Sequence, residues 1–319
     1  MLNSKLLLII SLNLFAAGHA QESWQAAGEA VPLTPAEQYF QQPVWSPDGT
    51  KIALAGENYR GIWVMKADGS QLQSLTNEPG AGLQFRWSAD SKEIVYRTHA
   101  YVKRRKTTQI KILNLELKQI RILKKYGAGY VGLPRWTLDR RFVYLYTKQG
   151  LDLIPTSNDI SEETSAGGYF QPIFYTTEKG FVLSDTRGNV FSQLQPVPGQ
   201  ILNARLSPSA EKIAFEIAGG NLYVVNIDGS DLVDLGKGER PAWSADSQWI
   251  AYMLPMDDGH QILSSDIYLI RVDGRAKTNL TQSPNRLEMN PDWAPGRPSV
   301  LFDEQKRGRI YSLELQKKE

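Results

Sequence analysis

The chain has 319 residues, 41% of them hydrophobic and 22% charged, and its formal net charge at pH 7 is +2. This is the ordinary balance of a soluble globular protein, and the length allows either two domains or one continuous repeat architecture. The chain contains no cysteine, which excludes a disulfide scaffold but does not identify a cellular compartment.

The N-terminus has the order of a secretory signal peptide. Lys5 supplies a positive charge, an apolar run continues to Phe15, and small residues lead to Ala20. The alternative is a first amphipathic helix of the fold, but the run is apolar on every side. We therefore expect residues 1–20 to be a signal peptide cleaved after Ala20, and residues 21–319 to be a single exported, periplasmic domain. A transmembrane helix needs about 18 consecutive apolar residues, and no later segment has an apolar run near this length. A membrane-spanning protein is therefore not expected.

A strand-turn-strand unit recurs along the rest of the chain. Its clearest copy runs from Val44 to Leu54 and contains the sequence Trp-Ser-Pro-Asp-Gly. Each copy has one central apolar residue, and these residues are Trp45, Trp87, Trp136, Phe174, Leu206, Trp243 and Trp293. They are separated by 42, 49, 38, 32, 37 and 50 residues, which scatters around the roughly 40 to 45 residues of a propeller blade. The sequence therefore predicts seven blades, with six as the alternative because the fourth copy is the weakest.

The residue types of the unit fit a turn between two strands. Ser46 and Asp48 supply acceptors for nearby backbone amides, while Pro47 fixes φ and Gly49 accepts positive φ. In most copies a third strand with an Asp-Gly turn follows, and a fourth short strand ends in Leu-Thr. Four antiparallel strands per copy make a blade of an all-β propeller. The seventh copy has room for only three, so we expect segment 31–34, which has the same Leu-Thr ending, to complete the last blade and close the ring.

The first copies carry a family resemblance. The unit Trp45–Ala53, followed by Ile62–Met65 and the Asp68-Gly69 turn, resembles the propeller repeats of the TolB family. The resemblance extends over nearly all of the chain after the predicted signal peptide. TolB is the periplasmic component of an envelope system. The resemblance therefore implies a periplasmic propeller that binds protein partners. Members of that family carry a small α/β domain before a propeller of six blades. Only about 25 residues lie between the predicted cleavage site and the first repeat here, so we expect that domain to be absent.

Few residues of the chain suit catalysis. After the predicted signal peptide it has two histidines, His99 and His260, which we place where a second strand turns into a third. A serine triad is not expected, because no Gly-x-Ser-x-Gly is present and the repeat serines are explained by their turns. A metal site needs three converging ligands, which the histidines and Asp257 or Asp258 could supply only if blades two and six met across the channel. We assign no catalytic residue, metal ligand or cofactor, and we expect binding rather than catalysis.

Positive charge is concentrated in residues 97–148, which hold 14 lysines and arginines against two acids. The densest part is 103–106, in a predicted hairpin between Tyr101 and Ile110. Such a run is often a solvated loop. The alternative is an electrostatic docking face for an acidic protein partner, lipopolysaccharide or anionic lipid. Nucleic acid is not expected, because an exported protein rarely meets it and no ladder of base-stacking aromatic residues is visible.

These features together indicate an exported, periplasmic scaffold whose rim loops bind an envelope protein partner. The alternative is the binding of an acidic carbohydrate, or a metal-dependent lyase or hydrolase reaction, in the central channel. Tyrosine and arginine anchor protein interfaces, and the predicted rim loops contain both. The predicted binding residues are Tyr59, Arg60, His99, Tyr101, Arg104, Arg105, Lys106, Tyr130, Arg135, His260 and Arg286.

Overall fold

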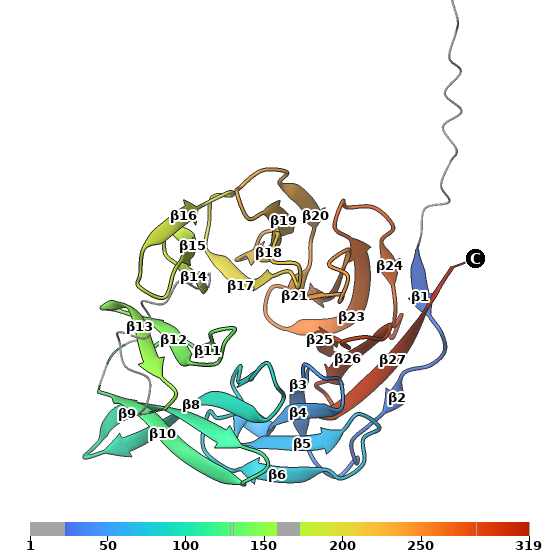
Figure 1. The fold of residues 1–319 in the computed structure, drawn as a ribbon. Coiled ribbons are helices and arrows are strands. Elements are labelled where there is room, and N and C mark those ends of the chain that lie inside the picture. The colour runs from blue at the N-terminus through green and yellow to red at the C-terminus, as the bar shows by residue number, and fades with distance from the viewer. Residues whose placement is uncertain (1–22, 128, 130, 158–172, 285, 319) are drawn as a thin grey trace, which may run out of the picture.

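A computed structural model of the chain describes residues 23–127, 129, 131–157, 173–284 and 286–318. Seven separate antiparallel sheets surround a common centre like the blades of a propeller (Figure 1). The prediction of an all-β propeller with seven blades is confirmed, and the six-bladed alternative is excluded. The predicted signal peptide and the candidate residue Tyr130 lie outside the described residues. In the part of the chain that is described, no helix is long and apolar enough to cross a membrane.

The strands of each blade are consecutive in the chain. Blade 1 consists of β3 (Phe40–Trp45), β4 (Lys51–Gly56), β5 (Ile62–Lys66) and β6 (Gln73–Thr76), with the helical turn η1 (Glu57–Tyr59) after β4. Blade 2 consists of β7 (Arg86–Trp87), β8 (Glu93–Val102), β9 (Arg105–Asn114) and β10 (Gln119–Tyr126). The described parts of blades 3 and 4 are β11 (Arg135–Trp136), β12 (Phe142–Thr147) and β13 (Gly150–Pro155), then β14 (Ile173–Thr177), β15 (Gly180–Ser184) and β16 (Val190–Leu194).

The second half of the ring is formed in the same way. Blade 5 consists of β17 (Ile201–Leu206), β18 (Lys212–Ile217), β19 (Leu222–Asn226) and β20 (Val233–Gly236). Blade 6 consists of β21 (Glu239–Trp243), β22 (Trp249–Asp257), β23 (Ile262–Arg271) and β24 (Thr278–Asn279). Blade 7 consists of β25 (Glu288–Trp293), β26 (Ser299–Glu304), β27 (Arg309–Lys317) and the N-terminal strands β1 (Trp24–Ala26) and β2 (Val31–Pro32).

The turn between the first and second strands has the chemistry that the repeat predicts. The Ser46 hydroxyl donates to Asp48 Oδ1 at 2.6 Å and accepts the Lys51 amide at 2.9 Å. Ser88 and Ser244 donate to the equivalent aspartates of blades 2 and 6 at 2.6 and 2.5 Å. All three serines are buried. Their interpretation as turn residues is therefore confirmed.

The repeated tryptophan connects neighbouring blades. Trp87 Nε1 donates to the Val44 carbonyl of blade 1 at 3.2 Å. Trp136 and Trp243 make the equivalent bond to the preceding blade at 3.1 and 3.0 Å. Trp45 differs, because its buried indole N–H has no hydrogen-bond partner among the described residues. The repeat therefore uses tryptophan both for its apolar surface and for its single donor.

This difference predicts two unequal substitutions. Trp87→Phe should lower the free energy of unfolding by about 1–3 kcal/mol more than Trp45→Phe, because only the former removes the donor of a carbonyl that lies between blades. Urea unfolding followed by circular dichroism measures both variants against the wild type. Equal losses in the two variants would contradict a hydrogen-bonding role for the repeat tryptophan.

The N-terminal segment closes the ring as predicted, and it does so with one strand, β1, in addition to the predicted segment 31–34. β1 and β2 both pair with β27, the last strand of the chain. Just after β2, the Leu33 amide donates to the Ile310 carbonyl at 2.8 Å, and Thr34 Oγ1 accepts the Ile310 amide at 3.0 Å. Leu280 and Thr281 make the same two bonds to the third strand of blade 6. The Leu-Thr ending is thus a structural signature of the outermost strand.

The fourth repeat does not begin where the sequence analysis places it. Leu194, at the end of β16, lies against Gly229 of the next blade, just as Leu235, at the end of a fourth strand, lies against Gly274. β16 is therefore the fourth strand of its blade, and β14 is the second. The assignment of Phe174 as the central residue ending a first strand is wrong. The tight turn after β14 matches the turn between the second and third strands of blade 3.

Candidate functional site

Most of the predicted binding residues lie on one face of the ring. Successive strands of a blade alternate in direction, so the connections between second and third strands share a face with the connections from blade to blade. We call this the hairpin face. It carries the loop with Tyr59 and Arg60, the β8–β9 turn, His260 in the β22–β23 connection, and Arg286 before β25. These residues come from blades 1, 2, 6 and 7, so they share a face without forming one cluster.

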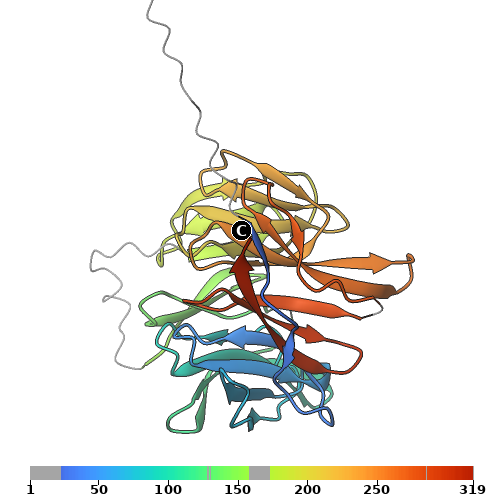
Figure 2. The same ribbon diagram turned by 90° about the vertical axis from the view of Figure 1, so that its right-hand side faces the viewer.

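Two hairpins of this face are longer than the others. β8 and β9 have ten residues each, and β22 and β23 have nine and ten, whereas the second strands β4, β12, β18 and β26 have six. Four additional residues extend a strand by about 13 Å. Figure 2 shows the orange β22–β23 hairpin projecting past the neighbouring blades. The two hairpins are therefore the most accessible parts of the hairpin face.

The tip of the β8–β9 hairpin is both basic and apolar. The chain reverses at Lys103 and Arg104, which have positive φ, and two more basic residues begin β9. Tyr101 and Val102 are 74% and 56% exposed. Strand pairing continues to the register Val102 opposite Arg105. The predicted hairpin between Tyr101 and Ile110 is thus mostly paired strand with a tight turn, which fixes the backbone that carries the basic side chains.

Four of the 14 basic residues of the predicted basic region form ion pairs with acids of other segments. The ion pairs are Lys111–Glu78, Arg121–Glu93, Lys124–Asp152 and Arg140–Asp90. None of the ion pairs among the described residues involves residues 103–106. The tip of the β8–β9 hairpin is therefore the densest part of the predicted docking charge, and none of its charge is offset by an ion pair among the described residues.

The two histidines do not form a site. His99 lies inside β8 opposite Thr108, whose hydroxyl is 3.3 Å from Nδ1. Its predicted place in a turn is wrong, because β8 continues for three residues beyond it. Burial lowers the pKa of His99, and the charges of Lys106 and Arg97 lower it further. His260 is exposed in blade 6, and in the part of the chain that the structure describes no three His, Cys, Asp or Glu side chains are grouped to hold a metal.

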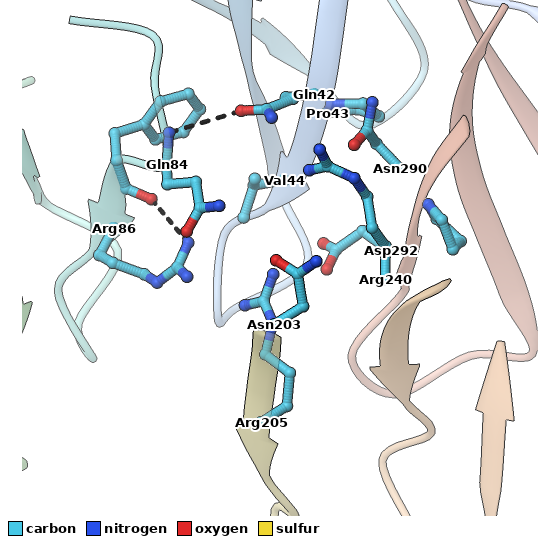
Figure 3. A pocket seen from close by; sticks show the side chains of 12 residues that line it. Gln42, Pro43, Val44, Gln84, Arg86, Asn203, Arg205, Arg240, Asn290 and Asp292 are labelled. Carbon is cyan, nitrogen blue, oxygen red and sulfur yellow. Dashed lines mark hydrogen bonds between the residues drawn. The ribbon is translucent and has the colours of Figure 1, made fainter. Parts of the chain in front are cut away.

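The centre of the ring holds a second candidate site, which the sequence analysis missed. The pairing of β3, β17, β21 and β25 shifts register at a bulge near the start of each innermost strand. At each of these bulges a residue with positive φ lines the central cavity, as does Gln84, which lies two residues before Arg86 of β7. The five residues are Gln42, Gln84, Asn203, Arg240 and Asn290. A bulge redirects a side chain that regular alternation would send elsewhere. The cavity has a volume of about 50 Å³ and is shown in Figure 3.

A cluster of arginines lies next to this ring of amides. Arg86 of β7, Arg205 of β17 and Arg240 of β21 line the cavity with one carboxylate, Asp292 of β25. In Figure 3 the three guanidinium groups and this carboxylate approach the same space. Arg135 of β11 is near enough for its charge to act on both Arg86 and Arg205. None of the four arginines takes part in an ion pair among the described residues.

The pKa shifts show how strongly the protein encloses these charges. Burial lowers the pKa of Arg86, and the charges of Arg205 and Arg135 lower it further. Burial also lowers the pKa of Arg205, although this residue keeps part of its surface exposed. Burial raises the pKa of Asp292 to about 6, against the opposing effects of the Trp45 amide, at 2.8 Å, and the arginines. These half-buried or exposed groups have thus lost part of their hydration. Among the described residues that line the cavity, Asp292 is the one carboxylate on which the charges of Arg86 and Arg205 act.

Two buried carboxylates hold the bulges in position. Glu216 accepts the Arg240 amide at 2.7 Å and the Asn203 side chain at 2.6 Å. Asp303 accepts the Asn290 side chain at 2.8 Å and a backbone amide of blade 1 at 3.2 Å. In each case one donor belongs to the blade of the acid and the other to the next blade. The channel lining is therefore fixed by contacts between blades.

A signal for the channel site is present in the sequence. In three copies of the repeat an arginine directly precedes the central apolar residue: Arg86, Arg135 and Arg205. Only Arg135 was among the predicted binding residues, and it was chosen for its place in the basic region. Among the seven copies, arginine is thus the most frequent residue at this position.

No family model matches the chain, and no curated protein matches it in sequence. Among solved structures, TolB from Acinetobacter baumannii matches 82% of this chain with 19% identity and a TM-score of 0.53, and the chain spans 59% of the length of that TolB chain. The Cps50 (Swd1) β-propeller domain of Myceliophteria thermophila matches 92% of this chain and 99% of its own length, with 10% identity and a TM-score of 0.63.

A third similar structure is the oligogalacturonate lyase of Vibrio parahaemolyticus. It matches 92% of this chain and 96% of its own length, with 12% identity and a TM-score of 0.50. Identities this low show a shared fold alone. At that level, the resemblance to the TolB propeller that the repeat predicted is confirmed.

Proposed function

We propose that the protein is an exported, periplasmic scaffold that binds a protein partner through its hairpin face. The observation that carries the proposal is the β8–β9 tip, where exposed Tyr101 and Val102 adjoin four consecutive basic residues. Aromatic and arginine side chains are enriched where binding energy is concentrated in protein interfaces. The signal-peptide pattern of residues 1–20 supports export.

The charges of the two long hairpins suggest how a partner would be oriented. The β8–β9 tip is basic, whereas the β22–β23 tip has Asp257 and Asp258 next to the exposed apolar side chains of Met256 and Leu263. Complementary charge sets the orientation and the association rate of a complex more than its affinity. We therefore expect a partner whose surface is acidic where it meets blade 2.

Reversing the charge of the basic tip should abolish binding of such a partner. The Arg104→Glu/Arg105→Glu variant is expected to recover at least about tenfold less partner than the wild type, because two attractive contacts become repulsive. Both proteins are produced from the full chain and purified from the periplasm, where the mature N-terminus should be Gln21. Partners are recovered from an envelope extract, identified by mass spectrometry and retested as purified proteins.

A matched control carries the same charge change on the opposite face. Lys118 and Arg275 are exposed and lie in connections between third and fourth strands. Lys118→Glu/Arg275→Glu should recover the partner as well as the wild type does. Equal recovery by all three proteins would rule out the basic tip as the docking site, and a protein retained in the cytoplasm would rule out export.

The channel arginines favour a second candidate function, the binding of an acidic ligand such as an acidic carbohydrate. One structure with the same fold is named as a lyase of oligogalacturonate, an acidic carbohydrate. Four arginines with one carboxylate provide a suitably positive channel. The metal-dependent reaction considered above has no corresponding ligand group among the described residues, so we propose binding alone for this site.

A further inference from the structure

We infer that Arg86, Arg205 and Arg240 form a binding site in the central channel for one oxyanion group, a carboxylate or a phosphate. The site rests on the acidic-ligand function proposed for the channel and names the chemistry that it recognises. It is independent of partner binding, since the three arginines lie on innermost strands, whereas the basic tip lies on the β8–β9 hairpin.

The first reason is the imbalance of charge. Neighbouring charges of one sign repel each other, and the repulsion grows when the groups are partly buried. Arg86 and Arg240 are half-buried and Arg205 is exposed, and none of the three is in an ion pair with a described residue. Within the described part of the chain, the guanidinium hydrogen bond that these three arginines make is from Arg86 to the Phe85 carbonyl at 3.1 Å. Among the described residues that line the cavity, Asp292 is the one carboxylate, and one carboxylate cannot neutralise three guanidinium groups. An anionic ligand would supply the missing charge.

The second reason is the geometry of the donors. A guanidinium group presents paired N–H donors that match the two oxygens of a carboxylate or phosphate. The arginines come from blades 2, 5 and 6, so they surround the cavity rather than face it from one side. The side-chain amides of Gln42 and Gln84 border the same cavity and add neutral donors. A ligand at the centre would thus be contacted from several blades.

The third reason is the size of the space. The cavity of about 50 Å³ exceeds the roughly 10–15 Å³ needed for one water molecule. It can take a single small oxyanion group between the arginines, and it is partly open rather than sealed. A larger ligand would therefore insert one acidic group between the arginines and leave the rest of its structure nearer the mouth of the channel. We expect recognition to depend on that group alone.

The site is held ready by the surrounding structure. The Arg240 backbone is fixed by Glu216, at 2.7 Å, and the Arg205 carbonyl accepts the Trp243 indole at 3.0 Å. The Arg86 carbonyl accepts the equivalent indole of blade 3. Backbones fixed in this way reduce the entropy that a ligand must overcome on binding.

Isothermal titration calorimetry with sodium phosphate and sodium galacturonate tests the site, with sodium chloride at equal ionic strength as the reference. We expect one anion per chain and a rise in Tm of about 3–6 °C near saturation. Arg205→Gln and Arg86→Gln should each weaken binding at least about tenfold. In the absence of the anion their Tm should equal or exceed that of the wild type, because a like-charge repulsion has been removed.

Arg105→Gln, which removes one exposed arginine of the basic tip, should bind the anion like the wild type. Binding of phosphate alone, of galacturonate alone or of both supports the site. The result also identifies whether the site takes a phosphate group, a carboxylate group or either one. Binding of neither to the wild type, or equal binding by the wild type and both channel variants, would overturn it. Arg240→Gln provides a third variant if either of the others does not fold. The channel variants should still bind the partner of the hairpin face, so failure of one proposal leaves the other testable.

Discussion

Replacing Asp303 by asparagine should remove a large pH dependence from the stability of the propeller. Asp303 is fully buried in blade 7. Its Oδ1 accepts hydrogen bonds from Asn290 and from the Gln42 amide, whereas Oδ2 has no hydrogen-bond partner among the described residues. Burial raises the pKa of Asp303 to about 7, although these hydrogen bonds oppose the shift. Asparagine keeps the acceptor and cannot ionise.

The direction of the pH dependence follows from which state, folded or unfolded, binds the proton. The ordinary pKa of aspartate is 3.8, so between about pH 4 and pH 7 the folded protein holds a proton that the unfolded chain has lost. The free energy of unfolding must then fall as the pH rises through this window and level off above it. Between pH 5 and pH 8 the loss from Asp303 should be about 3 kcal/mol. Asp303→Asn should not show this loss.

Urea unfolding at intervals between pH 5 and pH 8 measures the effect as the difference between the wild type and the variant. Taking the difference cancels the contribution of Asp292, which also titrates below pH 7. Asp48→Asn is the control. Hydrogen bonds from Ser46 and Thr50 lower the pKa of Asp48 to about 2 against the effect of burial, so its loss should not change the slope between pH 5 and pH 8. Parallel curves for Asp303→Asn and the wild type would show that Asp303 does not titrate in this window.

The fold could be predicted from the sequence because the same turn, with the same hydrogen-bonding residues, recurs along the chain. Ser46 and Asp48 form a closed set of local hydrogen bonds, and local sets of this kind do not depend on the rest of the chain. The Leu-Thr ending was equally informative, since Thr34 and Thr281 accept the same type of amide. Where the turn is absent, as around Phe174, spacing alone placed the repeat one strand too far along the chain.

The channel could not be predicted in the same way, because its lining depends on a local departure from alternation. Gln42, Asn203 and Arg240 have positive φ within a bulge, which is uncommon for residues other than glycine. Asparagine adopts this conformation more often than most residues, but glutamine and arginine give no such signal. The acids that fix the bulges, Glu216 and Asp303, lie on second strands and act between blades, so their role appears only when the ring is assembled.

For the basic region the sequence pattern overestimates the net positive charge that is available to a partner. Net charge counted along residues 97–148 ignores acids that the fold brings alongside, such as Asp152 beside Lys124 at 2.6 Å. Strand pairing sets these contacts across the sheet and between blades. The tip at 103–106 keeps its charge because a tight turn between two extended strands has few neighbours.

Removing the N-terminal strands should be the most damaging change to the fold. Deletion of residues 21–35 takes away β1, β2 and the Leu-Thr ending, and with them Trp24 and Ala26, which pack against the core of blades 6 and 7. Lost side-chain packing and hydrogen bonds together should cost about 5 kcal/mol or more. For a domain of this size we expect Tm to fall by at least about 10 °C. Differential scanning calorimetry of purified protein measures the change.

Closure by a separate strand also predicts rescue in trans. Without its partner, β27 becomes an open edge that can pair with another chain, so the truncated protein should self-associate in size-exclusion chromatography. A synthetic peptide of residues 21–36 should restore both Tm and the monomeric elution volume by adding back the missing strand. The same peptide with Gln25→Pro should fail, because proline removes a backbone donor within β1. Deletion of residues 21–29 alone, which spares β2 and Thr34, should cause an intermediate loss. A truncated protein as stable as the wild type would show that the ring closes without these strands.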